Sequence, residues 1–208
     1  MHGFMYFHTK LIKLTPMKLT SKITLFLCFS AMMLNSCSSD NSDEKEPTKV
    51  DSKTIKTYTD VAFSLDESEG FDAGRYFSTE TGKSYKKSQI DATILPKIDV
   101  AFYSGSYSLN YFMSPNESEF GIKNAPLTLY VNYQRDIMTI DQFDKIDEAS
   151  DFDVIKIDAD DEESFPDSYA PNVVLFKNAA GKKGAIYVKS VHRVGYDPRI
   201  IVDIKIQK

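Results

Sequence analysis

The sequence predicts an α+β fold in which a mainly antiparallel sheet carries one or two helices on one face. Apolar and polar residues alternate along short segments from residue 57 to the C-terminus, a pattern typical of half-buried strands. Two segments carry the signals of a helix start, and residues 173–208 contain apolar segments that are separated by turns. An all-β sandwich is the alternative fold.

Strands account for most of the expected elements. Residues 57–65 place Val61, Phe63 and Leu65 on one face at a period of two. The segment 98–103 is the best candidate for a central strand in the first half. Further strands are expected at 75–78, 107–113, 127–133, 173–176, 185–191 and 200–206.

Two short helices are expected between these strands. Ser84 is a candidate N-cap for a helix that runs to about Leu95 and is stopped by Pro96. Thr139 is the second candidate N-cap, and Gln142 lies three residues later, where it can complete a capping box.

The C-terminal segment predicts an antiparallel meander with one solvated side. The apolar strand 173–176 leads into the glycine-containing loop 178–184, and residues 185–191 return as its hairpin partner. A turn at 195–198 precedes the last strand. The apolar face of that strand consists of Ile200, Val202, Ile204 and Ile206.

The N-terminus has the layout of a secretory signal peptide. Lys18 and Lys22 precede the uncharged run 23–34, and small Ser36 precedes Cys37. The uncharged run has 12 residues, whereas a membrane-spanning helix needs about 20. We therefore expect residues 1–36 to be a signal peptide, whose true start is either Met1 or Met17.

The residues at the cleavage site resemble the lipobox of bacterial lipoproteins, in which the cysteine is lipidated and becomes the first mature residue. The resemblance implies lipid on Cys37 and attachment to a membrane through that lipid. The resemblance further implies the outer membrane, because the residue after the cysteine is Ser38 and not Asp. The acidic tract 38–44 resembles the surface-export signal of Bacteroidota lipoproteins and implies a surface-exposed protein.

Downstream of the lipidation site, we expect a flexible acidic tether at 37–55 and a single globular domain at 56–208. The segments 76–85, 97–103 and 113–116 of that domain resemble an uncharacterised lipoprotein domain of Bacteroidota. The resemblance covers roughly residues 57–208 and implies a location in the cell envelope. It brings no activity and no catalytic residues with it.

Charge and cysteine content limit the classes of function. Four of the 25 basic residues and none of the 30 acidic ones precede Cys37, which leaves 21 basic residues and a net charge of −9 for residues 37–208. Such a chain is a poor candidate for a nucleic-acid-binding protein, because binding to the phosphate backbone requires a basic face. Cys28 lies in the signal peptide and Cys37 takes the lipid, so the domain has no thiol for a disulfide or a nucleophile.

The densest group of carboxylates lies at residues 158–163. Asp158, Asp160 and Asp161 are weak candidates for a Ca²⁺ site, because alternating acidic residues in a loop can supply oxygen ligands. The run departs from the EF-hand pattern, with Glu163 at the glycine position and Tyr169 at the final glutamate position. A solvated acidic loop is therefore the preferred interpretation, and no metal is predicted.

Other candidate residues give no catalytic constellation. His192 is the single histidine after Cys37 and is expected to be partly exposed near a turn. Residues 104–108 do not match the nucleophile elbow of hydrolases. One set of tyrosines has two interpretations. They either line a groove in which sugars stack or serve ordinary packing, and they are Tyr103, Tyr107, Tyr111, Tyr130 and Tyr133.

Three functions remain open at this point. The first is a non-enzymatic envelope lipoprotein that binds or scaffolds other surface components, including envelope proteins. The second is a glycan-binding accessory protein of a nutrient-uptake system, which should present coplanar exposed tyrosines. The third is a hydrolase that uses acidic residues or a metal, which should show converging carboxylates in a deep pocket.

Overall fold

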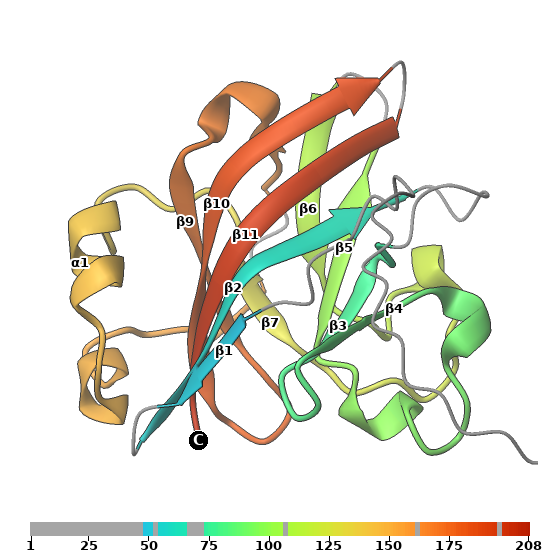
Figure 1. The fold of residues 1–208 in the computed structure, drawn as a ribbon, viewed down its shortest axis with the longest axis horizontal. Helices are drawn as coiled ribbons and strands as arrows, with labels where there is room; N and C mark the ends of the chain where they lie inside the picture. Colours follow the sequence, from blue (N-terminus) through green and yellow to red (C-terminus); the bar gives the residue numbers. More distant parts are fainter. Residues whose placement is uncertain (1–47, 52–53, 66–72, 106–107, 161–162, 195–196) are drawn as a thin grey trace, which may run out of the picture. The chain divides into compact units, whose positions relative to one another are not determined.

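The computed structural model describes residues 48–51, 54–65, 73–105, 108–160, 163–194 and 197–208, all within one compact unit, Ser42–Lys208. These residues form two antiparallel sheets with one short α-helix (Figure 1). The fold is therefore mainly antiparallel β and sandwich-like, as in the alternative expectation. The prediction of a single sheet covered by helices needs this correction.

Six strands make up the first sheet within the described ranges, in the order β1-β2-β11-β10-β9-β7. They are β1 (Thr48–Asp51), β2 (Ile55–Ser64), β7 (Leu129–Val131), β9 (Asn172–Lys177), β10 (Lys183–Val194) and β11 (Asp197–Gln207). The expected C-terminal meander is confirmed, because β10 pairs antiparallel with both β9 and β11.

The second sheet has the order β4-β3-β5-β6-β8. Its strands are β3 (Tyr76–Ser78), β4 (Lys83–Tyr85), β5 (Val100–Ser104), β6 (Leu109–Met113) and β8 (Phe165–Pro166). The helical segments are α1 (Ile140–Lys145) and the 3-10 helices η1 (Lys87–Gln89), η2 (Leu95–Lys97), η4 (Ser118–Phe120), η5 (Ala149–Phe152) and η6 (Asp167–Tyr169).

The two helix predictions have opposite outcomes. Thr139 caps α1 as expected, with its Oγ1 accepting from the Gln142 N–H and the Gln142 side chain accepting from the Thr139 N–H. The helix expected from Ser84 to Leu95 is wrong. Residues 83–85 pair with β3 instead, and the Asp91 carboxylate accepts the N–H groups of residues 93 and 94, which forms a local turn in place of a helix.

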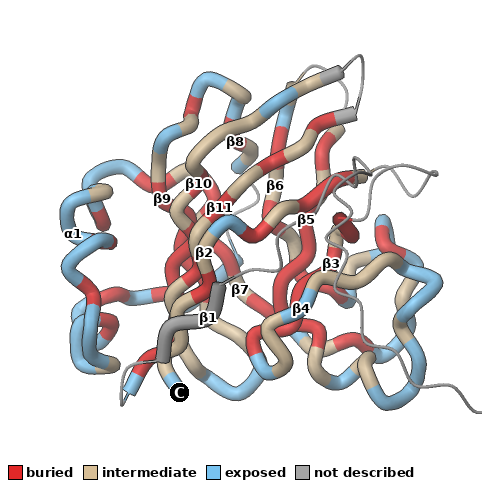
Figure 2. Tube along the Cα trace, viewed as in Figure 1, coloured by how far each residue is buried: buried red, intermediate tan, exposed pale blue. Residues whose placement is uncertain are grey.

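Aromatic rings from both sheets fill the space between them. Phe63 on β2 lies 6.3 Å from Phe77, 6.2 Å from Phe102 and 5.6 Å from Phe112, measured between ring centroids. The four apolar positions of β11 are buried in the same core, which confirms the alternation expected there. In Figure 2 buried positions run along the strands, whereas many turn residues are exposed.

Two β-bulges keep the apolar side chains of the long strands on the face that packs against this core. Tyr58 and Val61 both pack inside, although they are three residues apart, because Asp60 (φ 58°) is an extra residue in β2 opposite β11. Lys189 is the extra residue of β10 on the other side of β11. The Lys189 ammonium binds the carboxylates of Asp60 (2.7 Å) and Asp203 (3.1 Å), which joins the two bulges across the central strand.

The outer face of the first sheet is also covered. Phe143 of α1 and Phe152 of η5 belong to a second core that includes Val173 and Leu175 of β9. Lys205 on β11 donates to the carbonyl oxygens of residues 143, 144 and 146 at 2.9–3.0 Å, which satisfies the C-terminal end of α1. One helix therefore does lie on one face of a sheet, as the sequence suggested.

Strand β1 lies in the range 37–55 that was expected to form a tether. Residues 48–51 pair with β2, and β2 itself begins at Ile55, so these positions belong to the sheet. The expected signal peptide 1–36, Cys37 and the rest of the tether up to residue 47 lie outside the described residues. No helix within the described ranges is long and apolar enough to cross a membrane.

Candidate functional site

A groove of about 430 Å³ opens where turns from both sheets meet. The β3–β4 turn and the β9–β10 turn lie at the same end of the domain, near the C-terminus (Figure 1). The lining residues are Lys56, Thr79, Glu80, Pro96, Lys97, Asp99, Pro126, Asn178, Ala179, Ala180, Lys182, Ile206 and Gln207. Its volume lies within the range of small-ligand sites, about 300 to 1,000 Å³.

Asp99 is the buried ionisable group of this lining, with 7% of its surface exposed. Its Oδ1 accepts the Thr79 N–H (2.9 Å), and its Oδ2 accepts from the Thr79 hydroxyl and from Asn178 Nδ2 (3.2 Å). Burial raises the pKa of Asp99, and these hydrogen bonds partly offset the increase. The carboxylate thus holds the β3–β4 turn and the β9–β10 turn against the start of β5.

The backbone of Asp99 ties a third segment to the same point. Its carbonyl oxygen accepts from the Thr128 hydroxyl (2.9 Å) and from the Tyr130 hydroxyl (3.0 Å). Burial raises the pKa of Tyr130 well above its usual value, with the charge of Asp99 as the next cause. These contacts connect the Asp99 side of the groove to the core of the fold, to which Tyr130 belongs.

Besides the buried Asp99, the charged residues of the groove are three lysines and one glutamate. The Lys97 ammonium lies 2.8 Å from the Glu80 carboxylate, and the Lys56 ammonium donates to the Thr79 carbonyl oxygen (2.9 Å). The hydrogen bond from Lys97 lowers the pKa of Glu80, and the charges of Lys97, Lys56 and Lys182 lower it further. All three ammonium groups therefore act on the position that the Glu80 carboxylate occupies.

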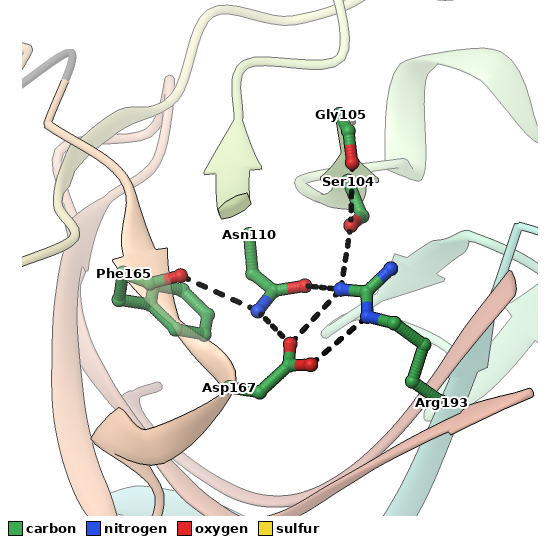
Figure 3. Close-up of polar contacts among 6 residues, drawn as sticks. All are labelled: Ser104, Gly105, Asn110, Phe165, Asp167 and Arg193. Carbon is green, nitrogen blue, oxygen red and sulfur yellow. Dashed lines mark hydrogen bonds and ion pairs between the residues drawn. The ribbon is translucent and has the colours of Figure 1, made fainter. Parts of the chain in front are cut away.

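A second polar cluster lies on β10 and the second sheet (Figure 3). Arg193 binds Asp167 through two parallel contacts, Nε to Oδ2 and Nη2 to Oδ1, both 2.9 Å. Asn110 donates to Asp167 (2.9 Å) and to the Phe165 carbonyl oxygen (3.3 Å), while its oxygen accepts from Arg193 (3.2 Å). The Arg193 hydrogen bond lowers the pKa of Asp167. Each group in this cluster satisfies another, so we assign it to holding the sheets together.

Of the three weak Ca²⁺ candidates, the structure describes Asp158 and Asp160. Asp158 is exposed. Asp160 Oδ1 accepts the Tyr130 N–H (2.7 Å), a backbone donor of the edge strand β7. Asp161 lies outside the described residues. No group of three or more His, Cys, Asp or Glu side chains that could hold a metal occurs in the part of the chain that the structure describes.

Of the tyrosines considered for sugar stacking, some pack in the interior and others lie partly exposed at the surface. Tyr130 is buried, and Tyr133 packs against Tyr169 at 5.0 Å. Tyr103 and Tyr111 face each other on β5 and β6, half-buried, with ring planes inclined at 50°. Tyr107 lies outside the described residues. The paired rings are therefore not the coplanar platform expected of a glycan binder.

His192 lies on β10, opposite Arg199 on β11, and is exposed, whereas a partly exposed residue near a turn was expected. The groove residues Thr79, Lys97 and Asn178 were not predicted from the sequence, because they come from turns far apart in the chain. Asp99 alone carried a signal, since it is an acidic residue between the apolar Ile98 and Val100.

Comparisons of the chain with protein-family models, curated proteins and solved structures give no match.

Proposed function

We propose that the chain is a lipid-anchored cell-envelope protein whose domain is a non-enzymatic binding module, with the groove as its ligand site. The observation that carries the proposal is the convergence of Lys56, Lys97 and Lys182 on one groove in a domain whose overall charge is negative. Ammonium donors on flexible side chains, next to the hydrogen-bonded Asp99, suit the capture of a polar ligand.

The contacts of Asp99 favour binding over hydrolysis. A catalytic acid or base must reach a proton of the substrate. Both oxygens of Asp99 already accept hydrogen bonds from Thr79 or Asn178, and its raised pKa follows from burial within the fold. The hydrolase hypothesis would need this carboxyl group to leave its partners.

Glycan binding is the second candidate function. The half-buried pair Tyr103 and Tyr111 is the feature that favours it, because aromatic rings stack on sugars. The inclination of the two rings makes the pair a weaker site than the groove. Binding of a neutral oligosaccharide at β5 and β6 would support this function.

The anchor is proposed from the sequence around Cys37. We expect wild-type protein from the native host to carry diacylglycerol on Cys37 and to sediment with outer membranes. A Cys37→Ala variant should lack this modification and leave the membrane fraction. Mass spectrometry that finds an intact leader, or an unmodified sulfur in a cytosolic fraction, would contradict the anchor.

A thermal-shift screen of the purified full chain tests the binding function. The panel comprises neutral oligosaccharides, organic and inorganic anions, and divalent cations. A ligand whose stabilising effect is lost in Lys182→Gln supports the groove as the site. A ligand that stabilises both proteins equally places binding elsewhere, and turnover of a panel member would make the protein an enzyme.

A further inference from the structure

The exposed ion pair at the rim of the groove indicates which ligands fit. Glu80 is carried by the tight turn after β3, where the Gly82 N–H donates to the Ser78 carbonyl oxygen (2.8 Å). The turn brings the Glu80 carboxylate to 2.8 Å from the Lys97 ammonium. A carboxylate thus already lies at the position where the lysines of the groove act together.

We propose that the groove binds its ligand through an anionic group, a carboxylate, sulfate or phosphate, which replaces the Glu80 carboxylate beside Lys97. This inference rests on the proposed binding function and adds to it the chemical class of the ligand. Glu80 is then an internal competitor that occupies the anion position until the ligand arrives.

Displacement of Glu80 requires little free energy. Its side chain is 63% exposed and that of Lys97 is 32% exposed, so water screens their attraction. A released Glu80 carboxylate remains hydrated at the rim, and its departure leaves no buried charge without a partner. The weak internal pair is therefore compatible with exchange for a ligand that makes further contacts.

The other two lysines strengthen the anion position. The Lys56 ammonium donates to the carbonyl oxygen of Thr79 (2.9 Å), the residue next to Glu80. This hydrogen bond holds the ammonium against the turn that carries Glu80. Lys182 lies in the β9–β10 turn, where its backbone N–H donates to Asn178 Oδ1 (3.1 Å), and its side chain lines the groove. Once Glu80 moves out, the lining contains three lysines and a single carboxyl group, that of the buried Asp99, so an excess of positive charge remains.

The floor of the groove limits the ligand to a small molecule. Asp99 below the rim is enclosed by Thr79 and Asn178, so the anion is bound at the lysines rather than deeper inside. Pro96, Pro126 and Ile206 add apolar surface to the lining, which suits a ligand with a nonpolar or ring-shaped body. A volume of about 430 Å³ accommodates such a molecule but not a folded partner.

Isothermal titration calorimetry of the full chain tests the inference with defined probes. Inorganic phosphate and citrate represent free anions, trigalacturonate and a sulfated disaccharide represent sugar-borne anions, and maltotriose is the neutral control. We expect at least one anionic probe to bind, with about tenfold weaker affinity in Lys97→Gln and several-fold tighter affinity in Glu80→Gln. The binding should weaken as salt is raised.

Matched variants on α1 separate this local effect from net charge. Lys145→Gln and Asp141→Asn make the same charge changes on exposed residues outside the groove, and both should leave the affinity of the anionic probe unchanged. An affinity that follows net charge in all four variants would overturn the inference.

Two further outcomes distinguish the inference from the binding function. If maltotriose binds and Lys182→Gln weakens it while Glu80→Gln has no effect, the groove is a ligand site but the anion and the competitor role of Glu80 are wrong. If no anionic probe binds the wild type or Glu80→Gln, the inference is overturned, and the thermal-shift screen decides the binding function separately.

Discussion

Asp99 is the residue whose protonation the fold controls through burial. Its carboxyl group accepts hydrogen bonds from Thr79 and Asn178, but desolvation is the larger effect and raises its pKa above the usual value of 3.8. A group with a raised pKa binds its proton more tightly in the folded state. The stability that this group contributes is therefore present below pH 3.8 and decreases as the pH rises through the raised pKa.

We expect this pH dependence to be absent in Asp99→Asn. As the pH rises from below 3.8 through the raised pKa, the free energy of unfolding of the wild type should decrease relative to that of the variant. Urea denaturation at several pH values measures the difference in the free energy of unfolding between the two proteins. The contributions of carboxylates with a lowered pKa cancel in this difference, because both proteins contain them. Parallel pH profiles for the two proteins would show that Asp99 does not titrate in this way.

Gly184 is the residue where the packing of the first sheet leaves no room for a side chain. A Cβ at this position would lie 2.4 Å from Cε1 of Phe176 and 2.8 Å from the carbonyl oxygen of Lys205. We expect Gly184→Ala to lower the free energy of unfolding by about 2 kcal/mol, the cost of overpacking a core. Gly105→Ala is the control, because its Cβ would meet only Tyr103, at 3.9 Å.

Chemical denaturation of both glycine variants gives the comparison. Equal stability of Gly184→Ala and the wild type would mean that the Phe176 ring and β11 move apart without cost. That result would contradict the close approach of β9, β10 and β11 at this position.

At the scale of single elements, Arg193 connects β10 to β6 and η6. Its two contacts with Asp167 are partly shielded, with side-chain exposures of 16% and 30%. We expect Arg193→Lys to keep the charge, lose the paired geometry and lower the free energy of unfolding by about 1 to 2 kcal/mol. Hydrogen exchange should become faster in β8 and η6, while the exposed neighbour His192→Gln leaves it unchanged.

The lowered pKa of Asp167 adds a pH test of the same contact. Its stabilising contribution is present above the unfolded pKa and is lost as the pH falls through the lowered pKa. The wild type should therefore lose part of its advantage over Arg193→Lys in acid. A stability difference between the wild type and Arg193→Lys that stays constant with pH would show that the pKa of Asp167 does not depend on Arg193.

Elements were predictable where a local pattern decides them. Thr139 and Gln142 satisfy each other across three residues, so the start of α1 could be found from the sequence. The helix expected after Ser84 failed because pairing of residues 83–85 with β3 prevailed over the N-cap signal. The bulge at Asp60 did leave a trace, since Tyr58 and Val61 are apolar and three residues apart within one strand.

For the whole molecule, the sequence predicts strands but not how they are divided between sheets. Alternation identifies one buried face, yet residues 173–176 are buried on both faces of β9, against the sandwich core and against the α1 side. The groove has the same origin. Its residues come from six separate segments, so only the pairing of the sheets brings Lys56, Lys97 and Lys182 together.

The acidic character of the chain concealed this basic groove. Residues 37–208 carry a net charge of −9, from which no basic surface was expected. The fold instead brings the positive charges of the three lysines together at the turns of one end. Net charge made nucleic acid a poor candidate for a partner, but it did not indicate the class of ligand.

Hydrogen-exchange mass spectrometry with a ligand from the binding screen tests the central claim most directly. If the groove is the ligand site, the wild-type chain should gain protection at residues 79–82, 96–99 and 178–184, and Lys182→Gln should lose it. Protection confined to β5 and β6 around Tyr103 and Tyr111, or spread evenly over the domain, would contradict a ligand site at the lysine groove.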